Sequence, residues 1–387
     1  MKFVDIVVIG QGLAGSAIAW TLAKHEIDFL VIDDDDRRSS SQIAAGLVTP
    51  ITGARHVESW AWTTAFPIAS QFYKGCELNT LKRFWNVEPA IRFFASQDES
   101  DRFQSRYFGE RSPLISSFGT SSKSTSSKST SSRWIGSPQH FQSELDRADL
   151  GSEVKASWGG FLMPEAARLF TAEYLQASRD YFQSVGRLCT ARIHSSEALT
   201  FHRDTIKIKA IDTQCKHIIF CEGHSSKTNP WFQSMELVPA QGDILTVRIP
   251  GLKLDRVLHC GFWIAPVGMD SSSNDSLYHV GSTYRWAPLN GLPNPESRTI
   301  LSEKLQGLFK RPFEVIDHLA AIRPAGFDHK PMLGSHPEDP RLWILNGLGA
   351  KGVLLAPWCA DMLVNTLKGK PSIHDELHWD RKRKKNG

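Results

Sequence analysis

The hydrophobic positions at the start of the chain predict a strand, a helix and a second strand, in that order. Residues 3–9 (FVDIVVI) form an apolar run with the length and the β-branched content of a buried strand. A glycine-rich turn follows at residues 10–15 (GQGLAG), and residues 16–22 then have the pattern of a helix. Residues 28–32 (DFLVI) predict a second buried strand, with Asp33 at its end. This order is typical of a βαβ unit that binds a dinucleotide.

Later hydrophobic patterns predict further strands and helices. Strands are expected at residues 90–95, 189–194, 198–203, 205–211, 217–221, 243–247, 262–266, 278–283 and 343–346. Amphipathic spacing predicts helices at residues 165–185, 295–309 and 353–367. Strands and helices alternate at both ends of the chain, whereas strands dominate between residues 237 and 320. We therefore expect an α/β protein, in which a Rossmann-like nucleotide-binding domain carries an inserted, mainly antiparallel β domain.

The same patterns suggest domain boundaries. The nucleotide-binding domain is expected to be discontinuous, over residues 1–60, 150–236 and 320–375, and the substrate domain to comprise residues 61–149 and 237–319. Residues 116–132 are rich in serine and contain KSTSS twice, so they are expected to form a disordered surface loop. Residues 376–387 form a tail whose basic run, at 381–385, is expected to be solvated.

Composition excludes several classes of protein. Hydrophobic content of 41% and charged content of 22% are ordinary for a soluble enzyme of 387 residues, and the net charge of +4 does not by itself favour nucleic acid or membrane. The six cysteines lack CxxC spacing, so we expect no metal site and a reducing compartment. No apolar run is long enough to span a membrane, and no signal peptide precedes the first strand. These features predict a cytoplasmic protein.

The first turn has the chemistry that a pyrophosphate requires. Gly10 permits a tight turn, Gly12 allows close approach of the backbone to phosphate, and Gly15 lets the helix lie near the strand. The helix N-terminus presents free N–H groups and a positive dipole end. A carboxylate at Asp33 can bind both hydroxyls of an adenosine ribose and would repel the 2′-phosphate of NADP. The alternative is a glycine-rich turn in an α/β protein that binds no nucleotide.

Several further segments occur in a characteristic order. They are residues 43–50 (IAAGLVTP), 220–226 (FCEGHSS), 239–242 (PAQG), 321–324 (AIRP) followed by Asp328, Pro331 and Gly334, and 346–353 (NGLGAKGV). Together with the first turn, they resemble the D-amino-acid oxidase superfamily of FAD-dependent oxidoreductases over most of the chain. Within it, the resemblance is to glycine oxidases and to the oxidase domain of bacterial bifunctional proteins that modify the tRNA wobble uridine.

The resemblance implies FAD as the cofactor. A helix N-terminus after the last glycine turn would stabilise negative charge on the reduced flavin, and Lys351 would add a point charge unless it is a solvated loop lysine. The implied cofactor-binding residues are Gly10, Gly12, Leu13, Ala14, Gly15, Asp33, Asp34, Ala45, Gly46, Leu47, Gly223, Gly347, Gly349, Lys351, Gly352 and Val353.

The resemblance also assigns substrate residues. Arg323 matches the arginine that pairs with the substrate carboxylate, and the alternative is a structural ion pair at a domain boundary. Hydride transfer from the amine-bearing carbon to the flavin would then need orientation and a neutral amine more than a protein base. Trp263 stands where glycine oxidases tend to have tyrosine, which puts small substrates such as glycine in doubt or else reflects a core role. Further candidates are Tyr284 and Arg285 for the pocket, and Arg55, His56 and Trp60 for its entrance.

We therefore expect an FAD-dependent oxidoreductase, oxidase or dehydrogenase, that oxidises a small amine or amino acid bearing a carboxylate. One alternative is an enzyme that acts on a carboxymethylaminomethyl wobble uridine of tRNA, since that substrate is also a secondary amine bearing a carboxylate and the basic run at 381–385 would add phosphate affinity. The other alternative is a flavin-binding protein without turnover. These patterns do not define the electron acceptor.

Overall fold

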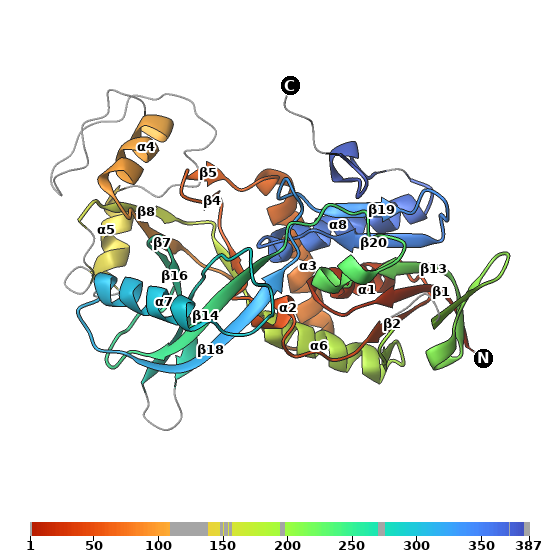
Figure 1. The fold of residues 1–387 in the computed structure, drawn as a ribbon. Helices are drawn as coiled ribbons and strands as arrows, with labels where there is room; N and C mark the ends of the chain where they lie inside the picture. The colour runs from red at the N-terminus through yellow and green to blue at the C-terminus, as the bar shows by residue number, and fades with distance from the viewer. Residues whose placement is uncertain are drawn as a thin grey trace.

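The structure, a computed structural model, describes residues 2–108, 138–147, 150, 154, 157–193, 198–269, 275–370 and 372–382. The predicted serine-rich loop at 116–132 lies outside the described residues, as do residues 383–387 of the predicted tail. The described residues form two halves, each built on its own sheet (Figure 1).

The first half is built on an eight-stranded sheet with the order β10-β2-β1-β13-β12-β11, to which β20 is added beside β13 and β19 beside β20. The strands β10, β2, β1, β13 and β20 are parallel where they pair. Their bounds are β1 Lys2–Ile9, β2 Phe29–Asp33, β10 Leu188–Thr190, β11 Leu199–Phe201, β12 Ile206–Ile208, β13 Thr213–Phe220, β19 Met332–Ser335 and β20 Leu342–Asn346.

Helices lie against this sheet and against one another and bury one large core. Helices α1 Leu13–Lys24, α6 Thr171–Ser184 and α8 Gly352–Leu367 contact its strands, α3 Trp62–Thr80 packs on α8 and α6, and the short α2 Ser40–Ile43 contacts α6. The core contains residues from α1, α3, α6 and α8 together with β1, β2 and β20. The Trp20 indole donates to Ser178 Oγ (2.9 Å) and joins α1 to α6, while the Tyr73 hydroxyl donates to the Val353 carbonyl (2.9 Å) and joins α3 to α8.

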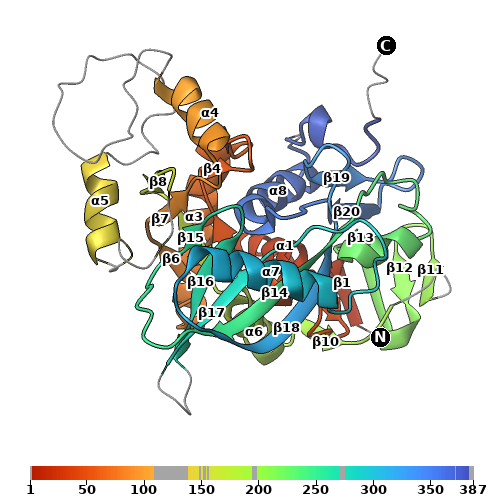
Figure 2. The ribbon, with the colours of Figure 1, turned by 60° about the vertical axis from the view of Figure 1, so that its left-hand side comes forward.

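The second half is a seven-stranded sheet, β18-β14-β17-β16-β15-β7-β8, which is antiparallel except for the β15–β7 pair. Helix α7 packs against β14 and β17, and α5 against β8 (Figure 2). The bounds are α4 Gln97–Phe108, α5 Pro138–Arg147, α7 Pro295–Leu308, β7 Ala90–Phe93, β8 Gly160–Met163, β14 Ala240–Arg248, β15 Leu258–His259, β16 Trp263–Met269, β17 Ser276–Gly281 and β18 Glu314–Arg323.

Small elements complete the described chain. A three-stranded sheet, β3-β9-β6, lies beside the two large ones, and β4 pairs with β5. Their bounds are β3 Leu47–Val48, β4 Ile51–Thr52, β5 Val57–Glu58, β6 Trp85–Val87 and β9 Ala167–Leu169, and the 3₁₀ helices are η3 Lys209–Ile211, η4 Gly223–Thr228 and η5 Asp375–Leu377.

The predicted α/β fold class is confirmed, but two of the predicted elements were wrong in extent. The helix expected at 165–185 begins only at Thr171, because Ala167–Leu169 forms β9 between β3 and β6. The strand expected at 205–211 ends at Ile208 and continues as η3. At β9, pairing with residues distant in sequence overrides the local spacing. After Ile208, the chain instead turns through η3 into β13, with which β12 pairs.

The division into two domains remains a prediction, and the sheets place three of its segments differently. Helix α3 falls in the range assigned to the substrate domain, yet it packs against α8. Strand β8 falls in the range assigned to the nucleotide domain, yet it pairs with β7 in the second sheet. Strand β18 crosses the predicted boundary at 319/320.

The predicted solvated tail is wrong at its first basic residue. The Arg381 guanidinium donates two hydrogen bonds to the Asp328 carboxylate (2.7 and 3.0 Å), and it also donates to the carbonyls of Lys330 and Pro331. Arg381 therefore fixes the turn that precedes β19.

The predicted entrance role of His56 is also wrong, because its side chain is fully buried beneath α4. The imidazole contacts the rings of Phe94, Phe103 and Phe161 edge-on, with centroid distances of 5.5–6.0 Å. Neither ring nitrogen has a hydrogen-bond partner among the described residues. Burial, followed by the nearby Arg92 charge, lowers the pKa of His56 to about 4.

The buried imidazole predicts a loss of stability in acid. Because the folded-state pKa of His56 lies below the unfolded value of 6.5, the unfolded chain takes up a proton first as pH falls, and stability declines between about pH 6.5 and 4. We expect His56→Asn, which tolerates the positive φ at this position, to lose fewer degrees of Tm than the wild type between pH 7 and pH 4.5. Exposed His202→Asn is the control. An unchanged dependence of Tm on pH in His56→Asn would contradict the assignment.

Candidate functional site

The glycine turn after β1 is shaped by close backbone contacts. Gly10 has φ +96°, and a Cβ there would lie 2.5 Å from the Cys221 carbonyl oxygen. A Cβ on Gly15 would lie 1.7 Å from the Gly10 carbonyl oxygen. Gly12 differs, since a Cβ there would meet only the Ser41 side chain, at 2.9 Å from its Oγ. Packing of the protein therefore requires Gly10 and Gly15, whereas at Gly12 only a flexible serine side chain would have to move.

The N-terminus of α1 offers hydrogen-bond donors to that space. Gly12 is the N-cap and supplies no side-chain cap, and the first turn of α1 contains no acidic residue. Helix geometry leaves the first four N–H groups without intrahelical acceptors. One of them, on Leu13, donates to Ser41 Oγ at 3.1 Å. This end of α1 has the positive potential that suits a pyrophosphate.

The Asp33 carboxylate lies beside the turn. It accepts hydrogen bonds from the backbone N–H of Gln11 (2.7 Å) and of Asp35 (2.8 Å). Asp34 is exposed and pairs with Arg192, with 3.3 Å between Oδ2 and Nε. The structure thus places Asp33, but not the Asp34 side chain, in contact with the glycine turn.

Arg179 on α6 is a site residue that the sequence analysis missed. Its buried guanidinium donates to Gln11 Oε1 (2.8 Å) and to Asp33 Oδ1 (3.1 Å), and its Nη2 has no partner among the described residues. It therefore holds the ribose-binding candidate in place. A charged residue on the apolar face of an amphipathic helix was the available signal, but its partners lie 146 and 168 residues away.

A second missed residue joins the two halves of the molecule. The buried Arg168 side chain donates to the Ala45 carbonyl (3.2 Å) and to the Pro266 carbonyl on β16. Gly46 contacts β9, the strand that carries Arg168, since a Cβ on Gly46 would lie 1.7 Å from the Leu169 carbonyl oxygen. The 45–47 segment is consequently fixed between β9 and the second sheet.

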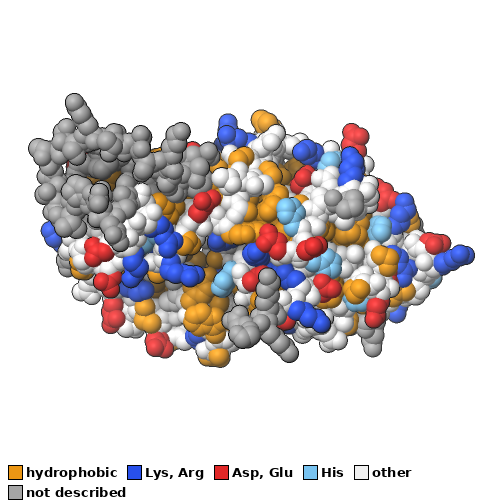
Figure 3. All heavy atoms as spheres, turned by 90° about the horizontal axis from the view of Figure 1, so that it is seen from above, with side chains coloured by type: hydrophobic (Ala, Val, Ile, Leu, Met, Phe, Trp, Pro, Cys, Tyr) orange, Lys and Arg blue, Asp and Glu red, His pale blue; other side chains and the backbone are white. Residues whose placement is uncertain are grey.

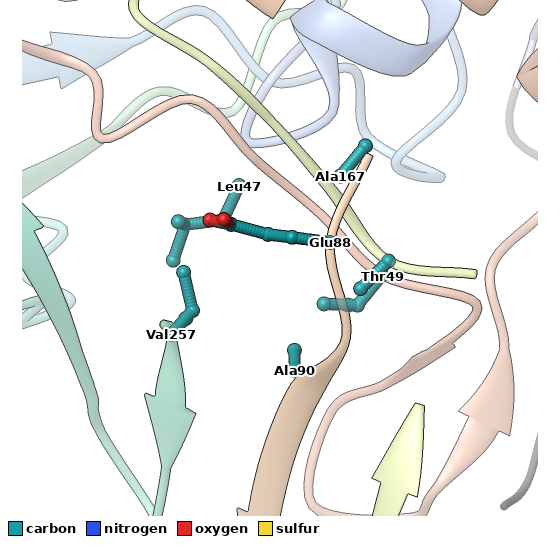
Figure 4. A pocket seen from close by; sticks show the side chains of 7 residues that line it. Leu47, Thr49, Glu88, Ala90, Ala167 and Val257 are labelled. Carbon is teal, nitrogen blue, oxygen red and sulfur yellow. The ribbon is translucent and has the colours of Figure 1, made fainter. Parts of the chain in front are cut away.

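A small pocket opens beside this segment, and the Glu88 side chain extends across it (Figure 4). Burial raises the pKa of Glu88, while the nearby Arg168 charge lowers it. Glu88 is thus a further titratable group, absent from the predicted site, that borders Leu47. The pocket is lined by Leu47, Thr49, Glu88, Ala90, Ala166, Ala167 and Val257.

The last glycine turn brings a second helix N-terminus to the first. Gly347 and Gly349 lead from β20 into α8, and a Cβ on Gly352 would lie 3.0 Å from Leu13 Cδ1. The first turn of α8 contains no acidic residue. Lys351, its N-cap, is half-buried rather than solvated, and burial lowers the pKa of its ammonium group. The starts of α1 and α8 therefore converge, as two anion-stabilising ends.

The turn after β13 completes this side of the site. The Asn346 amide donates to the Gly223 carbonyl (2.8 Å) and to Ser226 Oγ (2.7 Å), so the turns after β13 and β20 are joined. A second small pocket lies at this turn and borders Ile193 near the end of β10. It is lined by Ile193, Phe220, Glu222, Ser225, Thr228, Asn229, Pro230 and Trp231. Taken together, the glycine turn without a side chain at position 12, the N-termini of α1 and α8 and the fixed Asp33 carboxylate fit FAD.

The structure brings the predicted substrate residues together at the end of the second sheet. Strand β18 contacts α2, so Arg323 at its end lies at the junction of the halves (Figure 1). The Arg323 guanidinium donates to Ser282 Oγ (2.7 Å) and lies 4.4 Å from the Tyr284 ring centroid. It also lies against Gly242, where a Cβ would be 2.1 Å from Nη2. The Trp263 indole covers Gly281, where a Cβ would be 2.7 Å from Cζ2.

The alternative role of Arg323 as a structural ion pair has no support in the described part of the chain, where no carboxylate lies within ion-pair distance of it. Burial lowers the pKa of its guanidinium, and the Tyr284 and Asp243 groups oppose that shift. Among the described residues, Arg323 is therefore a half-buried cation without a carboxylate partner.

Asp243, which the sequence analysis also missed, holds the segment next to Arg323 in place. Its fully buried carboxylate accepts hydrogen bonds from the Thr283 hydroxyl (3.1 Å) and the Asn294 N–H (2.8 Å), and Oδ1 lies 3.0 Å from His318 Nε2. The segment that carries Ser282 and Tyr284 is thereby anchored to β14.

Two other predicted entrance residues lie in different surroundings. Arg55 is exposed on the β4–β5 turn. The Trp60 ring lies 5.6 Å from the Trp358 ring and 5.4 Å from Lys330 Nζ. Both roles stay predictions. Over the described ranges, no helix is long and apolar enough to cross a membrane, and no group of three or more His, Cys, Asp or Glu side chains is arranged to hold a metal ion.

Comparison with known proteins gives a consistent picture. Residues 5–366 match the family described as FAD dependent oxidoreductase (DAO). The tRNA 5-methylaminomethyl-2-thiouridine biosynthesis bifunctional protein MnmC of Marinobacter nauticus is 23% identical over 95% of this chain and 56% of its own length. The chain spans only 53–59% of the MnmC proteins it matches first.

Two other relatives match over nearly their whole length. The D-amino acid dehydrogenase of Paramagnetospirillum magneticum is 21% identical over 97% of this chain and 98% of that protein. The crystal structure of glycine oxidase from Bacillus cereus superposes with a TM-score of 0.73 at 17% identity, over 96% of this chain and 99% of that one, which establishes a common fold.

Because a Cβ on Gly12 would meet only a serine side chain, substitution there is expected to weaken FAD binding without preventing folding. Gly12→Ala should fold normally and bind FAD at least about tenfold more weakly, because a methyl group at the N-cap obstructs phosphate approach. Flavin absorbance of the purified protein and titration with FAD measure the loss, and Tm reports folding. Gly75→Ala in α3, where a Cβ meets no atom within 4 Å, is the matched control. Undiminished FAD affinity in Gly12→Ala would refute the assigned turn.

Proposed function

Because this chain belongs to the DAO family of FAD-dependent oxidoreductases, we propose that it oxidises an amine that carries a carboxylate, either an amino acid or an N-substituted glycine. The observation that carries the proposal is Arg323, a half-buried guanidinium for which the described residues supply no carboxylate partner. Its planar fork suits a bidentate carboxylate, and desolvation strengthens such a pair.

The residues around Arg323 would orient such a substrate. Ser282 and the Tyr284 ring hold the guanidinium in one position, and the absence of a side chain on Gly242 gives it room. The Trp263 indole covers Gly281, the residue before Ser282, and would present an apolar surface to the substrate. The guanidinium charge would also disfavour a protonated amine nearby and so favour the neutral form that oxidation requires. When bound, FAD supplies the two-electron acceptor.

A second candidate is oxidation of a carboxymethylaminomethyl group on a wobble uridine of tRNA. The likeness to MnmC over 95% of the chain favours it, and the substrate would present the same amine and carboxylate to Arg323. On the face drawn in Figure 3, basic and acidic side chains are interspersed. The basic residues 383–385 would then contribute phosphate affinity.

The tail can be tested without disturbing the fold. Because Arg381 binds Asp328, truncation has to begin after Lys382. If the substrate is tRNA, the protein lacking residues 383–387 should bind tRNA several-fold more weakly, with a smaller dependence of affinity on salt, since each lost phosphate contact reduces the slope by about one. Filter binding between low and physiological salt measures both quantities. Equal affinity and slope would remove the tail from the tRNA hypothesis.

The main proposal predicts a separation of cofactor binding from turnover. Arg323→Leu should keep its bound FAD and lose about 100-fold or more in kcat/KM for carboxylate substrates, because a buried charge-assisted pair is lost. Anaerobic loss of flavin absorbance with amino acids and N-methyl amino acids measures it, and Arg83→Leu, exposed on the surface, is the control.

Unchanged kinetics in Arg323→Leu would overturn the site assignment. Failure of the wild type to be reduced by any carboxylate-bearing amine would favour a flavin-binding protein without turnover. Reoxidation by air or only by an added acceptor then separates an oxidase from a dehydrogenase.

A further inference from the structure

Two large aromatic rings stand exposed next to Arg323. Tyr284 is 50% exposed and Trp286 is 64% exposed, and their ring centroids are 6.2 Å apart. The Tyr284 ring also contacts the Arg323 guanidinium, with 4.4 Å between Cζ and the ring centroid. The guanidinium, the Tyr284 ring and the Trp286 ring are therefore neighbours in that order, from the half-buried cation to the two exposed rings.

The backbone that carries these rings is firmly held. Arg285 exchanges two backbone hydrogen bonds with Gln241 on β14 (2.8 and 2.9 Å), so residues 284 and 286 project to the same face of an extended segment. The fully buried Gln241 side chain donates to the Leu292 carbonyl (2.7 Å) and accepts from the Gly291 N–H (2.9 Å). Asp243 fixes Thr283 in the same way. Two buried polar residues thus pre-organise an exposed aromatic surface, which lowers the entropy cost of binding there.

We propose that Tyr284 and Trp286 form a stacking platform for a planar ring on the nitrogen substituent of the substrate. The inference rests on the proposed function, since the carboxylate end is taken to bind Arg323. In an N-arylmethyl glycine, three atoms separate the carboxylate carbon from the ring, so the ring begins roughly 5 Å away. With its carboxylate on Arg323, such a substrate would therefore place its ring at the Tyr284 and Trp286 side chains.

The platform would select among carboxylate-bearing amines. Glycine and N-methylglycine have no ring to place on it, whereas an N-arylmethyl glycine or a nucleobase with a carboxymethylaminomethyl arm has one. Stacking on aromatic side chains is a common way to hold an unpaired base of RNA and is tolerant of base identity. The ring could belong to a free small molecule or to a base in an RNA loop, and both present the same chemistry to the platform.

The test compares N-benzylglycine with N-methylglycine on the FAD-loaded protein. Anaerobic flavin reduction gives the ratio of their kcat/KM values, and calorimetry under the same conditions gives the ratio of their Kd values. We expect the wild type to favour N-benzylglycine, and Trp286→Ala to reduce both ratios about tenfold, the effect of losing one stacked ring. Trp286→Phe should restore most of the preference. Leu292→Ala, at a side chain that is 55% exposed, should keep the wild-type ratios.

The outcomes separate the platform from the proposed function. A wild type without preference for N-benzylglycine, or an unchanged ratio in Trp286→Ala, overturns the platform even if both amines reduce the flavin. If neither amine reduces the flavin, the proposed function fails, and the Kd ratios still decide the platform.

The source of the ring requires a second comparison. The free carboxymethylaminomethyl uridine nucleoside and a short RNA stem-loop containing it are titrated against the wild type and Trp286→Ala. Weaker binding of both ligands to the variant supports the platform. A tighter, salt-dependent affinity for the RNA then identifies a macromolecular substrate, and equal affinities identify a small one. If Trp286→Ala weakens neither, the platform is overturned.

Discussion

The architecture depends on one backbone contact, in which Gly15 lies directly against the Gly10 carbonyl. Because no Cβ fits there, α1 can begin immediately at the end of β1, with its N-terminus beside the carboxyl ends of β1, β2 and β13. Gly352 brings α8 onto Leu13 in the same manner. Two helix N-termini thereby meet at the edge of the parallel sheet, where a phosphate-containing ligand is bound in folds of this type.

The second half of the molecule relies on buried polar side chains rather than on close glycine contacts. Gln241 and Asp243 lie on β14 and use their hydrogen bonds to hold loops that are 40 to 51 residues away in sequence. Buried polar groups of this kind are stable only when they are fully bonded, and for that reason they select a single loop conformation. Arg168 connects this half to the 45–47 segment through two carbonyl groups. The candidate substrate residues and the candidate cofactor segment are therefore positioned by separate networks that the buried Arg168 guanidinium connects.

Features governed by local pattern could be predicted from the sequence, and those that depend on distant partners could not. The βαβ start, the last glycine turn and α8 follow from apolar runs and glycine spacing, and the structure places them as expected. Strand β9 was predicted as part of a helix. Its three residues are a strand because they pair with two other strands, which local spacing does not reveal. Asp243 and Glu88 carry no local signal of their environment, and the only local signal of Arg179 is its place on the apolar face of α6, since a charged residue in sequence is far more often exposed. The burial of His56 was not predicted, because the three phenylalanines that surround its ring come from three separate segments of the chain.

The contrast among the three glycines of the first turn also bears on how such a chain can change over evolutionary time. Selection for a folded protein alone would retain Gly10 and Gly15, whose missing side chains the backbone itself demands. It would leave Gly12 free to drift, because only a flexible serine side chain opposes a methyl group there. A descendant that had lost its coenzyme but kept its shape would thus be recognisable by variation at that single middle position.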